Sequence, residues 1–133
     1  MQVTTLDGMS VKWNPVGATE FVRQKSSGHI ACRQLLKEMF PTCSVVEEVS
    51  IPVFYRSNYF LDFYVPLYKL AIEVHGQQHY KFTPHFHGSA ANFAMAKARD
   101  TNKSEWCEIN GIKLVVLNDY EVMDEWRKRI KNS

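Results

Sequence analysis

The sequence has 133 residues, of which 45% are hydrophobic and 13% aromatic, which excludes wholesale disorder and fits one compact domain. Its formal net charge of +2 and pI near 8.4 are mildly basic and give only weak support to a nucleic-acid partner. Three cysteines without Cys-x-x-Cys spacing argue against a disulfide framework. Because there is neither a leader-like start nor a run of about 20 apolar residues, we expect a soluble, cytoplasmic protein.

The first 25 residues are poorly patterned and are predicted to be an N-terminal extension or hairpin, which could wrap the domain or contact a partner such as DNA. The domain proper is predicted over residues 26–133. From His29 onward, apolar residues recur at steps of three and four, which predicts a helix. Ser26 or Ser27 can cap its start, and Pro41 ends it.

The middle of the chain has the composition of strands. Residues 56–58 and 66–69 are expected to be turns between them. The predicted strands are Ser44–Val49, Ile51–Tyr55, Tyr59–Val65 and Leu70–His75.

A long loop is expected over Gly76–Ser89, followed by a helix over Ala90–Asn110 that ends at Gly111. Ile112–Leu117 is an apolar strand of the kind found in the middle of a covered sheet, and Glu121–Lys131 is a closing helix. This order of elements predicts an α/β fold, with a mixed β-sheet flanked by α-helices.

The hairpin formed by the last two strands before the loop is the most informative segment. If its strands pair antiparallel about the centre of their turn, Asp62 lies directly opposite Glu73, with Cβ atoms roughly 4.5–5.5 Å apart on one face. Strand alternation places His75 on the same face as Glu73.

Two carboxylates side by side in an apolar hairpin repel each other, and a divalent cation would remove that cost. Hard oxygen ligands suit Mg²⁺ or Mn²⁺, and such an ion can activate water and stabilise charge on a phosphodiester. His75 could then act as general base or position the water. The plain alternative is that Asp62 and Glu73 are solvated and His75 is an ordinary turn residue.

The blocks LDFYVP at 61–66 and IEVHGQQHY at 72–80 resemble the PD-(D/E)xK nuclease superfamily. Within it they are similar to the branch of very-short-patch-repair endonucleases, which includes phage and mobile-element homing endonucleases with an EDxHD motif. SGH at 27–29 and NGIKL at 110–114 match as well, so the resemblance runs from about residue 26 to 120. It implies a restriction-endonuclease-like fold and metal-dependent hydrolysis of DNA, in a phage-infected or bacterial cell.

By this resemblance, Asp62 and Glu73 take the places of the two metal-binding acids, for Mg²⁺ or Mn²⁺. His75 stands where the superfamily usually has lysine, and a histidine there is familiar in the repair-like branch. His79 matches a second active-site histidine, and Asp100 matches a later acidic residue.

One position departs from the pattern, because many relatives have an acidic residue where this sequence has His29. Either His29 takes over that role, or Glu20 or another carboxylate supplies it, or the site lacks it.

Helical spacing places Asp100 and Lys103 on one stripe with Cys107. The two charged residues could be turned towards the site, or could form a surface ion pair. Basic residues are candidates for phosphate contacts, which would make binding strongly salt dependent. These nucleic-acid-binding candidates are Arg23, Lys25, Lys81, Lys97, Arg99 and Lys103.

The predicted loop carries His79, His85 and His87, which suggest a zinc site, alone or with Cys107. No paired cysteines accompany them, and aromatic loops often carry histidines without a metal.

The sequence therefore predicts a magnesium-dependent DNA endonuclease of phage or mobile-element type. The alternatives are a DNA-binding module that has lost catalysis, which the histidines at positions 29 and 75 motivate, and a structure-selective nuclease or ribonuclease. A sequence-specific double-strand cut by so small a domain would need a homodimer or additional DNA-reading parts.

Overall fold

The computed structural model describes residues 1–15, 26–76 and 88–133. Its centre is a four-stranded sheet in the order β3, β4, β5, β6, in which the first three strands are antiparallel and β5 and β6 are parallel. The strands are β3 (Val46–Phe54), β4 (Ser57–Val65), β5 (Leu70–His75) and β6 (Lys113–Asn118).

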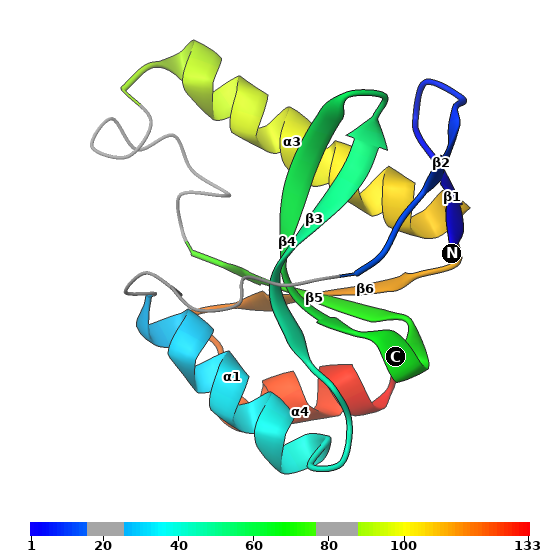
Figure 1. Cartoon of the computed structure of the whole chain (residues 1–133). Helices are drawn as coiled ribbons and strands as arrows, with labels where there is room; N and C mark the ends of the chain where they lie inside the picture. Colours follow the sequence, from blue (N-terminus) through cyan, green and yellow to red (C-terminus); the bar gives the residue numbers. More distant parts are fainter. Residues whose placement is uncertain (16–25, 77–87) are drawn as a thin grey trace.

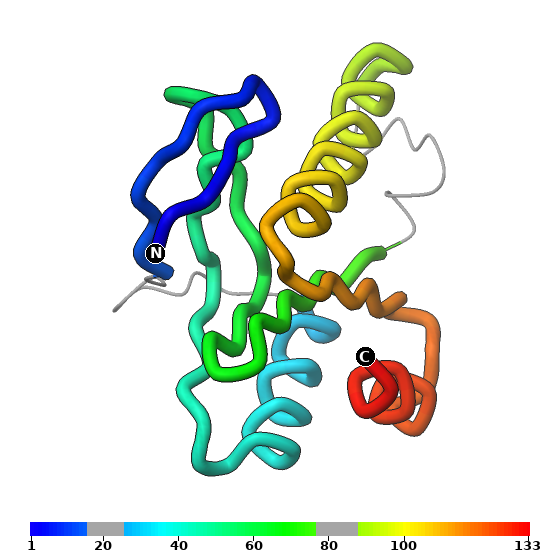
Figure 2. Tube along the Cα trace, turned by 90° about the vertical axis from the view of Figure 1, so that its right-hand side faces the viewer, coloured from blue at the N-terminus to red at the C-terminus, as the bar shows by residue number. Residues whose placement is uncertain are grey.

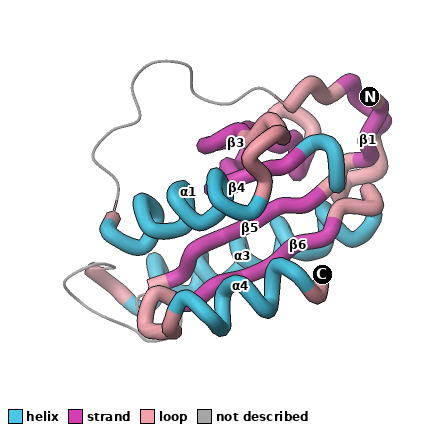
Figure 3. The backbone as a smooth tube through the Cα atoms, turned by 90° about the horizontal axis from the view of Figure 1, so that it is seen from below, coloured by secondary structure: helices cyan, strands magenta, loops and turns pink. Residues whose placement is uncertain are grey.

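Helices cover both faces of this sheet. Helix α3 lies on one face, and α1 and α4 lie on the other (Figures 1 and 3). The helices are α1 (Ser27–Met39), α3 (Ala90–Ile109) and α4 (Met123–Lys131). The predicted α/β class, a mixed sheet flanked by helices, is confirmed. In the part of the chain that the structure describes, no helix is long and apolar enough to cross a membrane.

The two longer helices begin and end where their capping residues predict. Ser26 Oγ accepts a hydrogen bond from the backbone N–H of His29, at 3.2 Å, and Ser89 Oγ does the same for Asn92. Gly111, with φ of +69°, follows the end of α3 in the left-handed conformation that glycine adopts readily.

The start of α1 lies close to the end of β5 because residue 28 is glycine. A Cβ atom there would lie 3.2 Å from Cγ1 of Val74 and 3.4 Å from Cβ of Asp119. The next residue is His29, so this close approach brings His29 to the sheet.

Two hydrophobic clusters fill the space on the two faces. The α3-side core contains Trp106 and Cys107, and the α1-side core contains Leu36 and Trp126. β5 separates these cores, since Ala71 belongs to the first and its neighbours Leu70 and Ile72 belong to the second. This is the alternation that the sequence predicts.

β3 changes faces at Glu48. The side chain of Glu47 reaches α1, whereas Val49 packs in the α3-side core, although residues two apart in a regular strand share a face. Glu48 has φ of +52°, and the cross-strand pairs pass from Glu47–Phe63 to Val49–Leu61 without a Glu48–Asp62 pair. The left-handed residue therefore turns the outer part of the hairpin onto the α3 side.

The structure corrects two expectations about this hairpin. The predicted strands Ser44–Val49 and Ile51–Tyr55 form the single strand β3, because Pro52 is tolerated in a strand at the sheet edge. The turn is shorter than residues 56–58, since Arg56 adopts φ of +64° and β4 begins at Ser57.

The structure also corrects the expectation that the apolar strand after α3 lies in the middle of the sheet. Among the described residues, β6 is an edge strand, and it is apolar because both of its faces are covered. Two side chains of α4 bond its carbonyl groups: Arg129 Nη1 donates to Val116 O and Trp126 Nε1 donates to Asn118 O, each at 2.9 Å.

The described part of the predicted N-terminal extension is a hairpin of β1 (Gln2–Thr4) and β2 (Ser10–Lys12), which lies beside the β3–β4 hairpin (Figure 2). Leu6 N donates to Val53 O at 2.7 Å, and Trp13 Nε1 donates to Ser50 O at 2.9 Å. Trp13 is buried in the α3-side core. This hairpin therefore protects the free edge of β3.

α4 begins at Met123, two residues later than predicted, because Glu121 is held outside the helix. Its carboxylate accepts hydrogen bonds from Arg129 Nη1, at 2.7 Å, and from the backbone N–H of Asn118, at 2.9 Å. The hydrogen bonds from Arg129 are the main reason that the pKa of Glu121 falls to about 2.

This lowered pKa predicts acid-sensitive stability. Because the carboxylate is favoured in the folded state, its contribution is present above pH 4.5 and is lost as pH falls towards 2. We expect Glu121→Gln to lower the free energy of unfolding at pH 7 by about 1–2 kcal/mol, discounted for the partly exposed Arg129, and to flatten its decline below pH 4.5. Urea denaturation between pH 2 and 7 measures this. Glu108→Gln, at an exposed position, is the control, and equal pH profiles for both variants would contradict the assignment.

Candidate active site

Asp62 and Glu73 face each other where β4 and β5 end their regular pairing. The register is the one that the sequence predicts, with Phe63 opposite Ile72. At the next pair, Asp62 and Glu73, the backbone N–H groups bond to side-chain carboxylates instead of to carbonyl groups of the opposite strand. The backbone N–H of Asp62 donates to Glu73 Oε2 at 3.1 Å, and that of Val74 donates to Asp62 Oδ2 at 2.8 Å. The two carboxylates are therefore locked next to each other by the backbone itself.

Glu73 lies where burial disfavours the charged form of its carboxyl group. The residue is only 4% exposed. Burial, and secondly the nearby carboxylate of Asp62, raise the pKa of Glu73 to about 8. Lys103 of α3 offsets part of this effect, because its Nζ lies 2.8 Å from Glu73 Oε1. The metal-free site therefore favours the protonated form of Glu73.

A cleft of about 470 Å³ opens next to Glu73, between α3 and the strands β5 and β6. His75, Asp100 and Lys97 line it together with Glu73 and Lys103. His75 is 8% exposed, and its Nε2 lies 4.0 Å from Asp100 Oδ1, which is too long for a hydrogen bond but within the range of an ion pair when the imidazole is protonated. Asp100 and Lys103 thus point towards the site, as one of the two readings of the α3 stripe expects.

His29 approaches from α1, on the other side of Asp62. Its Nε2 lies 2.8 Å from Glu47 Oε1, and Glu47 is also held by two hydrogen bonds from Arg33, of 2.8 and 2.9 Å. The imidazole ring stacks on Phe63 with a centroid distance of 4.5 Å and an interplanar angle of 28°. Both the position and the plane of the ring are therefore fixed.

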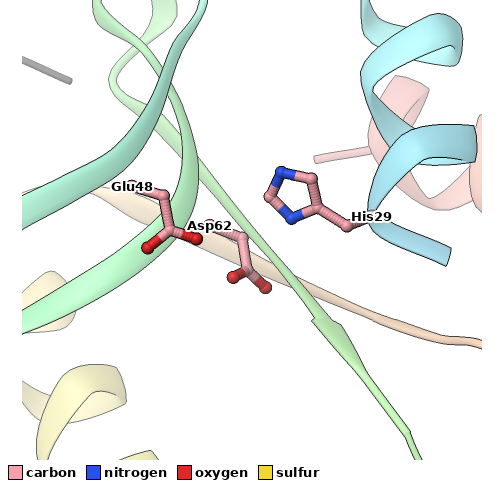
Figure 4. A group of neighbouring side chains, drawn as sticks. All are labelled: His29, Glu48 and Asp62. Carbon is pink, nitrogen blue, oxygen red and sulfur yellow. The ribbon is translucent and has the colours of Figure 1, made fainter. Parts of the chain in front are cut away.

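His29, Glu48 and Asp62 each offer one ligand atom, and these atoms lie within 4.8 Å of one another. Figure 4 shows the imidazole facing the two carboxylates from α1, with Glu48 and Asp62 on the neighbouring strands. Glu48 was missed by the sequence reasoning, which left open whether His29, Glu20 or another carboxylate completes the site. No local pattern in the sequence marks Glu48, because the residue reaches this place through a left-handed backbone conformation with φ of +52°.

The other candidates are placed in part. Arg99 is exposed on α3, Lys97 lines the cleft, and Cys107 is 1% exposed in the α3-side core. Several predicted residues lie outside the described residues: Glu20, Arg23, Lys25, His79, Lys81, His85 and His87.

No family model and no solved structure matches the chain. The chain is 40% identical over 67 residues to the uncharacterized protein 307L of Invertebrate iridescent virus 6, a match that covers 50% of this chain and 34% of that protein. It is 30% identical over 95 residues to the uncharacterized protein 033L of Invertebrate iridescent virus 3, which covers 68% of this chain and 47% of that protein. The matched stretches thus span less than half the length of these relatives.

The raised pKa of Glu73 predicts that the metal-free protein loses stability in alkali. The folded state holds a proton on Glu73 that the unfolded chain releases near pH 4.5, so the free energy of unfolding should fall as pH rises from 4.5 to about 8. We expect Glu73→Gln to remove this decline and to be the more stable protein at pH 8.5, by thermal unfolding in EDTA. Glu108→Gln, at an exposed position of α3 that does not line the cleft, is the control. If the stability of the wild-type protein and of Glu73→Gln fell equally as pH rises, the raised pKa of Glu73 would be contradicted.

Proposed function

We propose that the chain is a divalent-metal-dependent endonuclease that hydrolyses phosphodiester bonds in DNA, of the PD-(D/E)xK type that its motifs resemble. The observation that carries this proposal is the locked pair of Asp62 and Glu73, with Lys103 bonded to Glu73 and a cleft beside it. A buried carboxylate held beside a second carboxylate reduces stability unless a cation binds there, so this arrangement favours a functional role.

The donor set suits a divalent metal. Asp62 and Glu73 supply carboxylate oxygens, and a cation bound next to them would offset the burial and the charge of Asp62 that raise the pKa of Glu73. An ion such as Mg²⁺ or Mn²⁺ bound by Asp62, with the charge of Glu73 beside it, would supply Lewis-acid activation of water and charge stabilisation on the phosphate.

Lys103 is the residue best placed to act on the phosphate. The superfamily usually has a lysine where this chain has His75, and here α3 brings the ammonium group of Lys103 to the same acidic residue, 2.8 Å from Glu73 Oε1. A fixed cation at the cleft wall can bind a phosphate oxygen and stabilise the negative charge that develops during hydrolysis.

His75 and Asp100 are suited to proton transfer. In the proposed reaction, the oxygen of a water molecule forms a bond to phosphorus and the bond from phosphorus to the leaving sugar oxygen breaks. His75 accepts the proton that the water loses, and the leaving oxygen takes a proton from solvent. Asp100 Oδ1, 4.0 Å from His75 Nε2, would stabilise the imidazolium that results.

DNA as the substrate is supported by the basic residues of α3. Lys97 lines the cleft, and Arg99 is exposed on the same helix. A phosphodiester strand lying along α3 would meet both cations before it reached Lys103. The phage or mobile-element type remains a prediction from the motifs.

A DNA-binding module without catalysis is the second candidate, and one observation favours it. Glu73 already has an ammonium partner in Lys103, and Asp62 accepts a backbone hydrogen bond from Val74. A site satisfied in this way can persist without a metal.

Replacement of Asp62 separates the two candidates. We expect Asp62→Asn to lower the metal-dependent rate of plasmid nicking at least about a hundredfold, because the Lewis-acid contribution of a metal is worth several kcal/mol and each 1.36 kcal/mol is tenfold in rate. The rate is measured with Mg²⁺, with Mn²⁺ and with EDTA. Asp124→Asn, whose side chain is 82% exposed, is the matched control.

Cleavage by Asp62→Asn at the wild-type rate would refute the assignment. Salt-dependent DNA binding without cleavage by the wild-type protein, on genomic as well as plasmid DNA, would establish the inactive module. Preference for RNA or branched DNA over duplex in competition would redirect the substrate.

Lys103 and Lys97 are predicted to have different kinetic effects. Lys103→Met should lower kcat with little change in KM, because the ammonium acts on the phosphate during the reaction. Lys97→Met should raise KM and reduce the salt dependence of binding, because we expect Lys97, which lines the cleft, to contact only the sugar–phosphate backbone of the DNA. Steady-state kinetics on a fluorescent duplex at two salt concentrations measures both effects. A kcat unchanged in Lys103→Met would exclude the role given to that residue.

A further inference from the structure

The geometry points to a mixed nitrogen and oxygen metal site made by His29, Glu48 and Asp62, which selects Mn²⁺ over Mg²⁺. The three ligand atoms come from α1, β3 and β4 and lie within 4.8 Å of one another. This inference rests on the proposed function for what the ion does, but the binding itself does not depend on catalysis.

The oxygens of Glu73 explain why the ion would lie on the α1 side of Asp62. Oε1 of Glu73 is bonded to Lys103 and Oε2 accepts from the backbone of Asp62. Asp62 is held through Oδ2 by the N–H of Val74, which fixes the carboxylate, and one of its oxygens lies within 4.8 Å of the ligand atoms of His29 and Glu48 (Figure 4).

His29 has the surroundings of a metal-binding histidine. With Nε2 bonded to Glu47, Nδ1 is the ring nitrogen that can bind an ion. A carboxylate on the second nitrogen is the usual partner of a histidine ligand, because it fixes the tautomer and makes the binding nitrogen more basic. Here Arg33 in turn orients Glu47 through two hydrogen bonds, and Phe63 supports the ring plane. This is more support than a buried histidine needs for packing alone.

Glu48 pays a conformational cost for its position. A left-handed φ of +52° is unfavourable for a residue with a Cβ, and glycine or asparagine would adopt it more readily. The same backbone conformation is what brings the carboxylate of Glu48 near His29 and Asp62, although Glu47 beside it also faces His29. The strain is therefore explained if the carboxylate is needed at this point.

The ligand types determine which ion is favoured. Mg²⁺ strongly prefers oxygen ligands and keeps much of its water, whereas Mn²⁺ accepts an imidazole nitrogen together with carboxylates. Zn²⁺ also accepts this set of ligands. Because Zn²⁺ binds many histidines outside any built metal site, Mn²⁺ is the more stringent probe of this one.

The test is a titration of the full chain with Mn²⁺, in which electron paramagnetic resonance measures the concentration of free Mn²⁺ at each step. We expect one Mn²⁺ per chain, displaced by Mg²⁺ only at a concentration at least about tenfold higher. Glu48→Gln should weaken Mn²⁺ binding at least about tenfold. Removing even a residue that only hydrogen-bonds a metal ligand lowers metal affinity roughly 10–100-fold. Glu38→Gln on α1, with a side chain 68% exposed, is the matched control and should bind as wild type. Circular dichroism checks that each variant is folded.

The nitrogen ligand is tested without any substitution. Electron spin-echo modulation of bound Mn²⁺ in the wild-type protein should show coupling to an imidazole nitrogen. Absence of that coupling, equal affinity for Mg²⁺ and Mn²⁺, or undiminished binding by folded Glu48→Gln would each overturn the inference. Binding with all the expected properties but no nuclease activity would leave this site standing and refute the proposed function.

Discussion

The cross-strand pair of Asp62 and Glu73 is the constraint around which the rest of the site is arranged. Two carboxylates in a hairpin that is otherwise buried are held together by backbone N–H groups, so neither can turn away to solvent. On one side of the pair, Lys103 of α3 forms an ion pair with Glu73. On the other side, α1 places His29 near Asp62. Both helices are positioned by features outside the pair, including Gly28, whose missing side chain lets α1 approach β5.

The site lies where the two hydrophobic cores meet. β3 passes from the α1 side to the α3 side at Glu48, so polar groups can collect there without breaking either core. Glu47 and Glu48 reach the same histidine only because the strand is irregular at this point. A regular strand would have placed one of these acids on the opposite face. The same irregularity thus shapes the sheet and supplies the carboxylate that we propose as a ligand.

Local signals predicted much of this arrangement. Serine caps and a terminal glycine gave the ends of α1 and α3, and the symmetry of the turn after β4 gave the register that opposes Asp62 and Glu73. Glu48 could not be found in this way, because its position depends on a left-handed backbone conformation, and a glutamate in the sequence does not predict that conformation. The edge position of β6 also escaped prediction, since helices that cover both faces make an edge strand as apolar as a central one.

The central claim is that the carboxylate of Asp62 binds a divalent cation, and locating the ion tests it most directly. Crystals of the wild-type protein grown with Mn²⁺, measured near the manganese absorption edge, would place the ion by its anomalous scattering. The account predicts an anomalous peak at coordination distance from the carboxylate of Asp62. Crystals saturated with Mn²⁺ that show peaks only elsewhere, or none, would contradict it.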